Sequence, residues 1–275
     1  MPAITANGLR FHVVDEGAGA PVILLHGFPD TSSVWRHQIP ALTAIGLRAI
    51  APDLRGRGQT ERPDRVEEYA LANMVADVAA LLDALEIGRA HIIGHDWGAA
   101  VAWLFASLMP QRVERLVTLS VGHPAVRAKP TLDALQKGWY RLLFLFPNAE
   151  DILRQDDWAL FRTLFQGAVD VDRYVADLGQ PGALTAGLNW YRANLPPESL
   201  ARSAPPALPP AQAPTLGIFG THDRYLSEEP MAQSGQCVTG PWRYERIEGA
   251  GHWIQLDAPD QVNRLIVDFL QSPAV

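Results

Sequence analysis

A carboxylate stands where a sharp turn would lift one side chain out of the fold. In Gly94-His95-Asp96-Trp97-Gly98, glycines lie two positions before and two positions after Asp96. A tight turn from a strand into a helix needs such small flanking residues, and it raises the middle side chain above the sheet. Unlike a serine hydroxyl, a carboxylate is already anionic at neutral pH and can displace a leaving group at a saturated carbon. Asp96 therefore favours an alkylating step over ester cleavage, for which a serine would be expected at this position.

An acid and a base follow later in the chain, each just past the end of a short apolar run. Asp223 ends Gly220-Thr221-His222-Asp223, and His252 lies in Gly251-His252-Trp253. If the substrate forms an ester with the nucleophile, His252 can deprotonate a water that attacks the ester carbonyl, while Asp223 orients the imidazole and stabilises the imidazolium. His222 is an alternative base, but its neighbour Asp223 could not easily orient it.

Attack on an ester carbonyl creates an oxyanion, which needs two hydrogen-bond donors. The backbone N–H of Trp97, directly after the nucleophile, is one candidate. The other is the backbone N–H of Phe28 in the loop His26-Gly27-Phe28-Pro29, which also follows an apolar run. We expect Trp97, Phe28 and Pro29 to line the substrate pocket, together with His123 at the end of a predicted strand.

The elements that must position these side chains alternate between strands and helices. Ala90 to Ile93, before Asp96, is a predicted strand, and Ala99 to Met109, after it, is a predicted helix. Other strands are predicted at Leu9 to Asp15, Val22 to Leu25, Arg48 to Ala51, Arg115 to Val121, Thr215 to Phe219 and Tyr244 to Ile247. Such alternation predicts a mostly parallel sheet covered by helices on both faces, with sites beyond the carboxyl ends of its strands.

The alternation stops between His123 and about Ala211, where aromatic residues crowd together. They are Trp139, Tyr140, Phe144, Phe146, Trp158, Phe161, Phe165, Tyr174, Trp190 and Tyr191. We expect a helical insertion laid over the sheet, ended by the proline-rich linker Pro205 to Pro210. The chain then divides into a first core part at 1–123, a helical cap at 124–212 and a second core part at 213–275.

The composition excludes several classes of partner and site. The formal charge of −7 is spread along the chain without a basic stripe, so neither nucleic acid nor an anionic membrane is an expected partner. Cys237 is the only cysteine, which excludes disulfides and cysteine-rich metal sites. No run of about 18 uncharged apolar residues occurs, and the start lacks a signal-peptide pattern. We expect a cytoplasmic monomer or homodimer with no metal or organic cofactor.

The chain resembles the epoxide hydrolases of the α/β-hydrolase superfamily. The likeness lies in the turn at Asp96, the His26-Gly27-Phe28-Pro29 loop, the Gly251-His252-Trp253 turn and Asn189-Trp190-Tyr191-Arg192. The order nucleophile, acid, base is also that of the superfamily's triad. The resemblance implies an α/β-hydrolase fold, in which a mostly parallel eight-stranded sheet is flanked by helices and carries an inserted helical cap.

The same resemblance implies roles for five side chains. Asp96 would be the nucleophile, His252 the base and Asp223 its orienting acid. Two cap tyrosines would bind the epoxide oxygen: Tyr191, in the motif above, and Tyr140, which precedes an aromatic run. Opening an epoxide creates an alkoxide, and a tyrosine hydroxyl, with a pKa near ~10, stays protonated and can donate to it. The implied activity is hydrolysis of an epoxide to a vicinal diol, and the aromatic cap favours an apolar substrate.

Three other functions remain open. A haloalkane dehalogenase would share Asp96 and His252, and Trp97 matches its halide-binding tryptophan, but Phe28 stands where an asparagine is usual. A haloacetate dehalogenase would carry an arginine in place of Trp97. A non-catalytic ligand-binding protein on the same fold usually lacks a triad member, whereas none is absent here.

Overall fold

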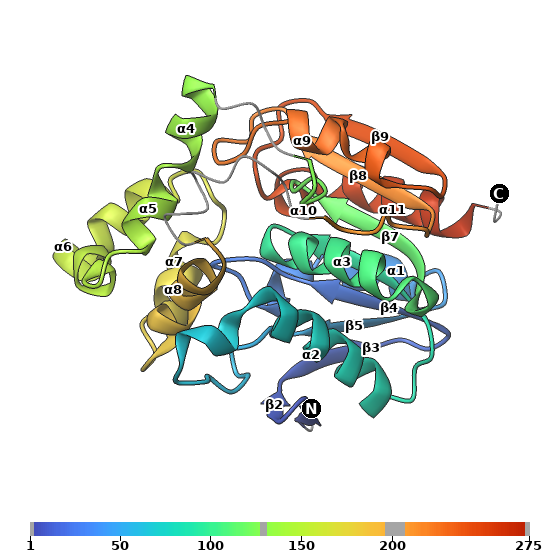
Figure 1. The fold of residues 1–275 in the computed structure, drawn as a ribbon, viewed down its shortest axis with the longest axis horizontal. Coiled ribbons are helices and arrows are strands. Elements are labelled where there is room, and N and C mark those ends of the chain that lie inside the picture. Colours follow the sequence, from blue (N-terminus) through green and yellow to red (C-terminus); the bar gives the residue numbers. More distant parts are fainter. Residues whose placement is uncertain (1–2, 127–130, 196–206, 273–275) are drawn as a thin grey trace.

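The computed structural model describes residues 3–126, 131–195 and 207–272. Its centre is a seven-stranded sheet with the order β3-β5-β4-β6-β7-β8-β9, in which every pair of neighbours is parallel except β3 and β5 (Figure 1). The strands are β3 Val13–Glu16, β4 Ala20–Leu25, β5 Leu47–Pro52, β6 Ala90–His95, β7 Val113–Leu119, β8 Thr215–Gly220 and β9 Trp242–Ile247. The mostly parallel sheet that the sequence predicts is thus confirmed.

The sheet has seven strands among the described residues and not the expected eight. The run Leu9 to Asp15, predicted as one strand, is divided at His12. The His12 N–H donates to Thr60 Oγ1 at 3.0 Å, and its carbonyl accepts from the Asp53 N–H at 2.9 Å. The Thr60 hydroxyl accepts from the His12 N–H and donates to the Asp53 carbonyl at 2.6 Å, so it lies between the two groups that the next ladder bond would join, and the run is interrupted there. Its first part joins a separate two-stranded hairpin formed by β1 Ile4–Ala6 and β2 Leu9–Phe11.

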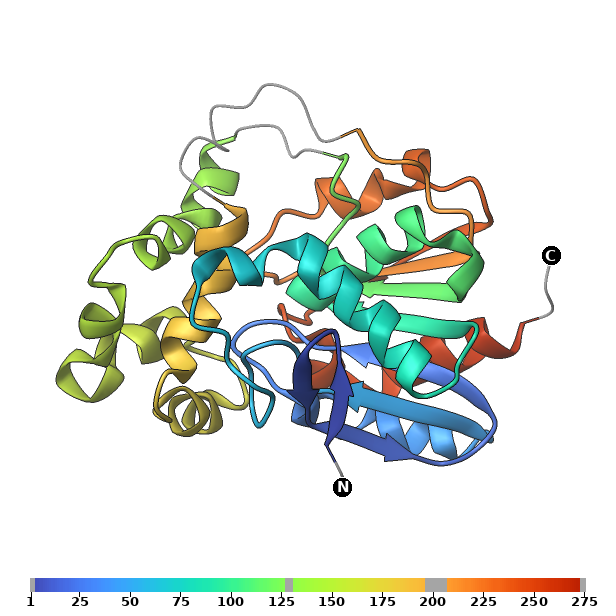
Figure 2. The same cartoon turned by 60° about the horizontal axis from the view of Figure 1, so that its bottom comes forward.

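Helices cover both faces of the sheet (Figure 1, Figure 2). Helices α2 and α3 pack together on one face, and α1 and α11 pack together on the other. In α2 the buried side chains include Met74, Val78 and Leu81, at the helical spacing that the sequence shows. The core helices are α1 Gln38–Thr43, α2 Leu71–Ala84, α3 Trp97–Leu108, α9 Glu229–Ala232, α10 Ile254–Asp257 and α11 Pro259–Gln271, with 3₁₀ turns η1 Ser32–Trp35, η2 Val66–Tyr69, η3 Pro110–Arg112 and η5 Ser234–Cys237.

Five described helices lie between β7 and β8 in the chain, to one side of the sheet (Figure 1). They are α4 Leu132–Gly138, α5 Tyr140–Phe144, α6 Ala149–Leu164, α7 Val171–Leu178 and α8 Ala183–Asn194. Helix α6 is interrupted at residues 155–158, where three consecutive residues have positive φ angles. The described part of 124–212 contains no strand, only an isolated bridge at Ala211. Of the predicted linker, residues 205 and 206 lie outside the described residues, and 207–210 are irregular.

The core of the molecule lies on both sides of the central strands. All six residues of β6 are buried, and so are Trp103 and Phe105 of α3. A strand buried on both faces carries a continuous apolar run, which is why the sequence predicts this one. Within the described ranges, no helix is both long enough and apolar enough to cross a membrane.

Candidate active site

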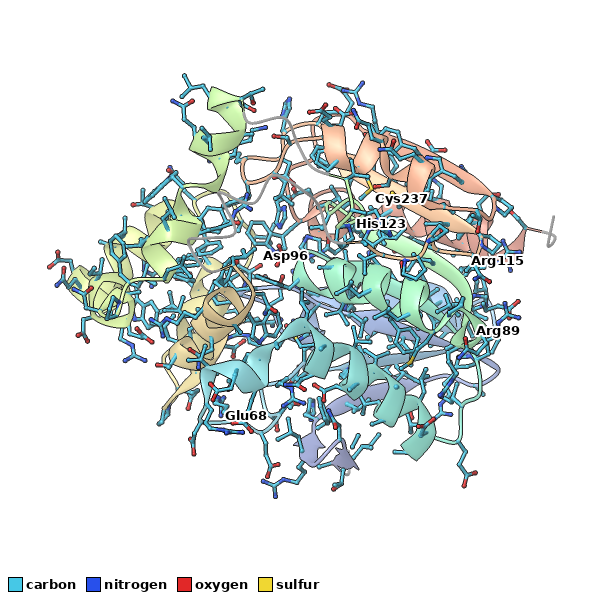
Figure 3. All side chains as sticks on the ribbon, in the orientation of Figure 1. Glu68, Arg89, Asp96, Arg115, His123 and Cys237 are labelled. Carbon is cyan, nitrogen blue, oxygen red and sulfur yellow. The ribbon has the colours of Figure 1, made fainter. Side chains whose placement is uncertain are left out.

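Asp96 lies at the turn between β6 and α3, with φ of 52° and ψ of −122°. Few residues other than glycine adopt a positive φ, so the surroundings must hold this conformation. The flanking glycines leave no space for a side chain. A Cβ on Gly94 would lie 2.4 Å from the Gly98 carbonyl oxygen, and one on Gly98 would lie 2.1 Å from the Leu25 carbonyl oxygen. The turn thus presents Asp96 between the sheet and the five inserted helices (Figure 3).

His252 lies between two carboxylates. Its Nδ1 is 2.8 Å from Asp223 Oδ2, and its Nε2 is 3.6 Å from Asp96 Oδ2. Asp223 is itself held, because its Oδ1 accepts hydrogen bonds from the N–H groups of Tyr225 and Leu226 at 2.8 and 2.9 Å. A carboxylate in this position makes Nδ1 a donor and directs Nε2 toward Asp96. The structure therefore brings together the three side chains that the sequence predicts as a triad.

His252 and Asp96 each stabilise the charged form of the other. Burial alone would lower the pKa of His252, but Asp223 and Asp96 raise it to about 10. Burial would raise the pKa of Asp96, but a hydrogen bond and the charge of His252, with a further bond from the Phe28 N–H, hold it below its ordinary value. At neutral pH the resting site therefore contains an imidazolium beside an ionised Asp96.

One oxygen of Asp96 is held by the backbone. The Phe28 N–H donates to Asp96 Oδ1 at 2.9 Å. Gly27 permits this approach, because a Cβ there would lie 2.4 Å from Asp96 Oδ1. The other expected donor, the Trp97 N–H, belongs to the first residue of α3. Asp96 Oδ1 thus faces a backbone donor, whereas Oδ2 faces His252.

Two tyrosines from the inserted helices lie over Asp96. Tyr140 begins α5 and Tyr191 lies in α8, and their ring centroids are 6.2 Å apart. Burial raises the pKa of Tyr140 to about 12 and that of Tyr191 well above its ordinary value. Both hydroxyls therefore stay protonated at neutral pH and can donate hydrogen bonds. Tyr174 is also buried, but it lines neither of the cavities at Asp96.

Two cavities meet at Asp96, Tyr140 and Tyr191. The larger has a volume of about 120 Å³ and is lined by Asp96, Trp97, Ala100, Val121, Tyr140, Arg141, Tyr191, Leu195 and Leu226. The smaller has a volume of about 10 Å³ and is lined by Phe28, Asp96, Tyr140, Phe165, Tyr191, Tyr225, His252 and Trp253. Among the described residues, no cluster of three or more His, Cys, Asp or Glu side chains could hold a metal ion.

Two of the expected pocket residues lie elsewhere. The His123 ring packs edge-on against Trp103, with centroids 5.0 Å apart, and its Nε2 is 3.3 Å from Ser107 Oγ. His123 therefore points into the core behind α3, lines neither cavity, and stands apart from Asp96 in Figure 3. Pro29 lines neither cavity, and its carbonyl accepts a hydrogen bond from Arg57. Phe28 and Trp97, by contrast, line the smaller and the larger cavity respectively.

Two further residues at the site escape the sequence analysis. Tyr225 lines the smaller cavity, with its ring 5.2 Å from that of His252. Asp30 is 2% exposed and accepts a hydrogen bond from Trp253 Nε1 at 2.9 Å, and burial raises its pKa to about 7. In the sequence, Asp30 begins a run typical of helix N-caps, so nothing marks it as a residue of the site. The one available signal is position, since Tyr225 comes two residues after Asp223 and Asp30 directly follows the loop that carries Phe28.

Comparison with known proteins finds relatives that match over nearly the whole chain. A family profile for the alpha/beta hydrolase fold matches residues 20–259. Epoxide hydrolase A of Mycobacterium tuberculosis is 33% identical, and the match covers 97% of this chain and 96% of that protein. The AB hydrolase superfamily protein YfhM of Bacillus subtilis is 34% identical, covering 98% of this chain and 97% of its own. An epoxide hydrolase from Bacillus megaterium, solved in complex with an inhibitor, superimposes with a TM-score of 0.88 at 26% identity, covering 98% of this chain and 100% of that one.

Proposed function

Since the chain belongs to the α/β hydrolase fold family and is a hydrolase, we propose that it converts an apolar epoxide to a vicinal diol through an ester on Asp96. The observation that carries this proposal is a carboxylate, in place of a hydroxyl, at the turn facing His252, with two tyrosines lining the same cavity. Relatives named epoxide hydrolases, from Mycobacterium tuberculosis to Homo sapiens, support the same activity for this chain.

In the first step, Asp96 Oδ2 attacks one carbon of the epoxide ring. This oxygen is the available one, because Oδ1 accepts the Phe28 N–H. A bond forms between Asp96 and the carbon while the ring carbon–oxygen bond breaks, and the ring oxygen takes a proton from Tyr140 or Tyr191. The His252 imidazolium then releases a proton to solvent, and the tyrosinate takes one from solvent. His252 is left neutral.

The ester changes the charge around His252. Asp96 is one of the two carboxylates that raise the pKa of His252, and esterification removes its negative charge. The pKa of His252 therefore falls, so that the neutral imidazole can take a proton from water. The smaller cavity, of about 10 Å³, has room for one such water beside it. Alkylation thus turns His252 into a base at the stage when an ester is present to hydrolyse.

The hydroxide adds to Cγ of Asp96, and Oδ1 becomes the oxyanion. The Phe28 N–H already donates to Oδ1, and the Trp97 N–H is the proposed second donor. The intermediate then breaks the bond between Cγ and Oδ2, and Oδ2 leaves as a hydroxyl oxygen of the diol, taking the proton of the new carboxyl group, while the oxygen from water stays on Asp96. The diol leaves with Asp96 ionised and His252 protonated, as at the start of the cycle.

The proposed cap comprises residues 124–212, and the proposed core comprises 1–123 and 213–275. In this division the nucleophile, the base and the orienting acid come from the core, and the two tyrosines come from the cap. The docking of cap on core therefore sets the distance between the nucleophile and the proton donors. A cytoplasmic location and a monomeric or homodimeric state stay predictions from the sequence.

We predict that the wild-type protein forms diol from styrene oxide and that Asp96→Ala forms none. A bromoalkane and a nitrophenyl ester, assayed beside the epoxide, represent the rival activities. Halide release without diol would make the protein a dehalogenase, and ester cleavage alone would make it an esterase. Inactivity on all three substrates would favour a non-catalytic binding protein.

The covalent step and the proton donors can be tested in one background. His252→Gln should be alkylated but not turn over, so its intact mass should rise by one molecule of epoxide. In this variant, adding Tyr140→Phe or Tyr191→Phe should slow the rise by a factor on the order of 10². Tyr174→Phe is the matched control, because Tyr174 is also a buried tyrosine of the inserted helices but lines neither cavity. An unchanged mass excludes the ester, and equal rates in all three tyrosine variants exclude the proposed proton donors.

A further inference from the structure

One cation lines the larger cavity at Asp96. Arg141 is the second residue of α5 and directly follows Tyr140. The other described residues of this lining are apolar or aromatic, except for Asp96 itself. Burial raises the pKa values of Tyr140 and Tyr191, and the charge of Arg141 opposes this rise. The guanidinium therefore acts across the cavity in which the reaction is proposed to occur.

Arg141 has no hydrogen-bond or ion-pair partner in the part of the chain that the structure describes, and its Nε is buried without an acceptor. Two other cap arginines are paired. Arg192 forms a two-pronged pair with Glu150 at 2.7 and 2.8 Å, and Arg162 contacts Asp172 at 2.6 Å. A partly buried cation without an acceptor loses hydration that no hydrogen bond replaces. The free donors of Arg141 indicate that an anion binds there.

Packing holds this guanidinium in place. Its central carbon lies 5.9 Å from the centroid of the Tyr140 ring. Gly138, almost one helical turn earlier, gives it room, because a Cβ at Gly138 would lie 2.7 Å from Nη2 of Arg141. Neither contact neutralises the charge or accepts a hydrogen bond. These contacts thus hold Arg141 in place but leave its N–H groups without an acceptor among the described residues.

The two cavities limit the shape of a substrate that lies between Asp96 and the tyrosines. The larger, at about 120 Å³, is close in size to a cavity of roughly 150 Å³ that admits benzene. The smaller, at about 10 Å³, holds a single water. One side of the epoxide can therefore carry a substituent of about the size of a phenyl ring, and the other side can carry none.

We propose that the substrate is a terminal epoxide whose single substituent, about as large as a phenyl ring, ends in a carboxylate bound by Arg141. This inference rests on the proposed function and refines it, since the body of the substituent stays apolar and only its far end is charged. A carboxylate suits the site because its two oxygens match two N–H groups of a guanidinium. The formal charge of −7 repels anions from the molecule as a whole, so the attraction comes from Arg141.

Two substrates of matched shape separate charge from size: 4-(oxiran-2-yl)benzoate and the uncharged 4-(oxiran-2-yl)benzamide. We expect kcat/KM of the wild type to favour the benzoate by about tenfold or more, and added salt to reduce this preference by screening. Arg141→Met should abolish the preference, and Arg141→Lys should retain part of it. Arg154→Met is the matched control and should keep the wild-type preference, because Arg154 lies over a ring, 5.8 Å from that of Trp158, but is exposed and outside both cavities.

Equal selectivity in wild type and Arg141→Met, with diol still formed, would overturn the role of Arg141 and leave the proposed function standing. The single substituent is tested with trans-β-methylstyrene oxide, which should react about 100-fold more slowly than styrene oxide because the extra methyl displaces the reacting carbon. Comparable rates for these two epoxides would overturn the limit to terminal epoxides. Absence of diol from every epoxide would overturn the proposed function and this inference with it.

Discussion

Asp30 and Asp223 are both buried acids of the site, but their hydrogen bonds differ. Asp223 accepts from two backbone N–H groups and from the triad histidine. Asp30 accepts from Trp253 Nε1 and also faces the Tyr174 hydroxyl, whereas His95 Nδ1, 3.9 Å from its Oδ2, forms no hydrogen bond. Because so few donors replace its lost hydration, burial raises the pKa of Asp30 to about 7. Near neutral pH its ionisation opposes folding.

We predict that Asp30→Asn makes the free energy of unfolding less sensitive to pH. The folded pKa of about 7 lies above the ordinary value, so between about pH 4 and pH 7 the folded protein keeps a proton that the unfolded chain releases. Stability therefore falls as the pH rises through this window, and the full loss, at most about 4 kcal/mol, is present above it. Asparagine still accepts from Trp253 but does not ionise.

Urea unfolding at about pH 5 and about pH 8 measures this effect. The gain in stability of Asp30→Asn over wild type should be larger at the higher pH. Asp96 and His252, which also act on Asp30, are present in both proteins. Asp268→Asn, an exposed acid paired with Arg243, is the control and should follow the wild type. Parallel curves for Asp30→Asn and wild type would contradict the prediction.

At the scale of elements, most strands and the longer core helices were predictable because each carries its own signal. The run Ala90 to Ile93 is apolar on both faces, and the side chains of α2 repeat at helical spacing. The run Leu9 to Asp15 gives no such guide, since its break at His12 depends on hydrogen bonds to a loop that lies far along the chain. Aromatic crowding predicts a helical insertion but has no period, so it cannot give helix bounds or the cavity that Arg141 lines.

The turn between β6 and α3 is the element that depends most on its glycines. We predict that Gly98→Ala lowers kcat about 100-fold or more and destabilises the fold by about 1–3 kcal/mol. The added Cβ would lie 2.1 Å from the Leu25 carbonyl oxygen, which is backbone and cannot turn aside. The turn must therefore move, and Asp96 moves with it. Kinetics on an epoxide and thermal unfolding of the purified variant measure both effects.

Gly88→Ala is the control for this substitution. A Cβ at Gly88 meets nothing within 4 Å, and the glycine precedes the same strand without a positive φ. The variant should match the wild type in activity and stability. If Gly98→Ala behaves like Gly88→Ala, the contact between the turn and β4 is looser than the structure indicates.

At the scale of the whole molecule, the site lies where two parts of the chain meet. Asp96, Asp223 and His252 lie outside the inserted helices, the two tyrosines lie in them, and polar contacts join the two parts. Arg36 pairs with Asp170 at 2.6 Å, and Trp190 Nε1 donates to the Arg55 carbonyl at 3.0 Å. Chain order and strand ends predict the three core residues. No local pattern predicts which tyrosines of the inserted helices face those three residues. The prediction of Tyr140 and Tyr191, and not Tyr174, therefore depends on the resemblance to a family.

Asn194, at the end of α8, links the helix that carries Tyr191 to the core. Its Oδ1 accepts from the Leu71 N–H at 2.8 Å, and its Nδ2 donates to the Tyr69 carbonyl at 2.9 Å. Asn194→Ala leaves these groups unpaired, which should cost about 1–3 kcal/mol. Tyr191 lies less than one helical turn from Asn194, so loosening this end of α8 should displace Tyr191 and slow alkylation about tenfold. Hydrolysis of the ester depends on residues of the proposed core and should keep its rate.

Rapid-quench mass measurement separates the two steps in Asn194→Ala. Asn73→Ala is the control, because Asn73 also donates to two carbonyls, those of Glu67 and Glu68, but joins no part of the cap. It should leave both steps unchanged. A loss confined to alkylation in Asn194→Ala would mean that the docking of α8 on the core sets the position of Tyr191. Equal losses in both steps would mean that core and inserted helices respond as one body, so that the proposed cap has no separate influence on the chemistry.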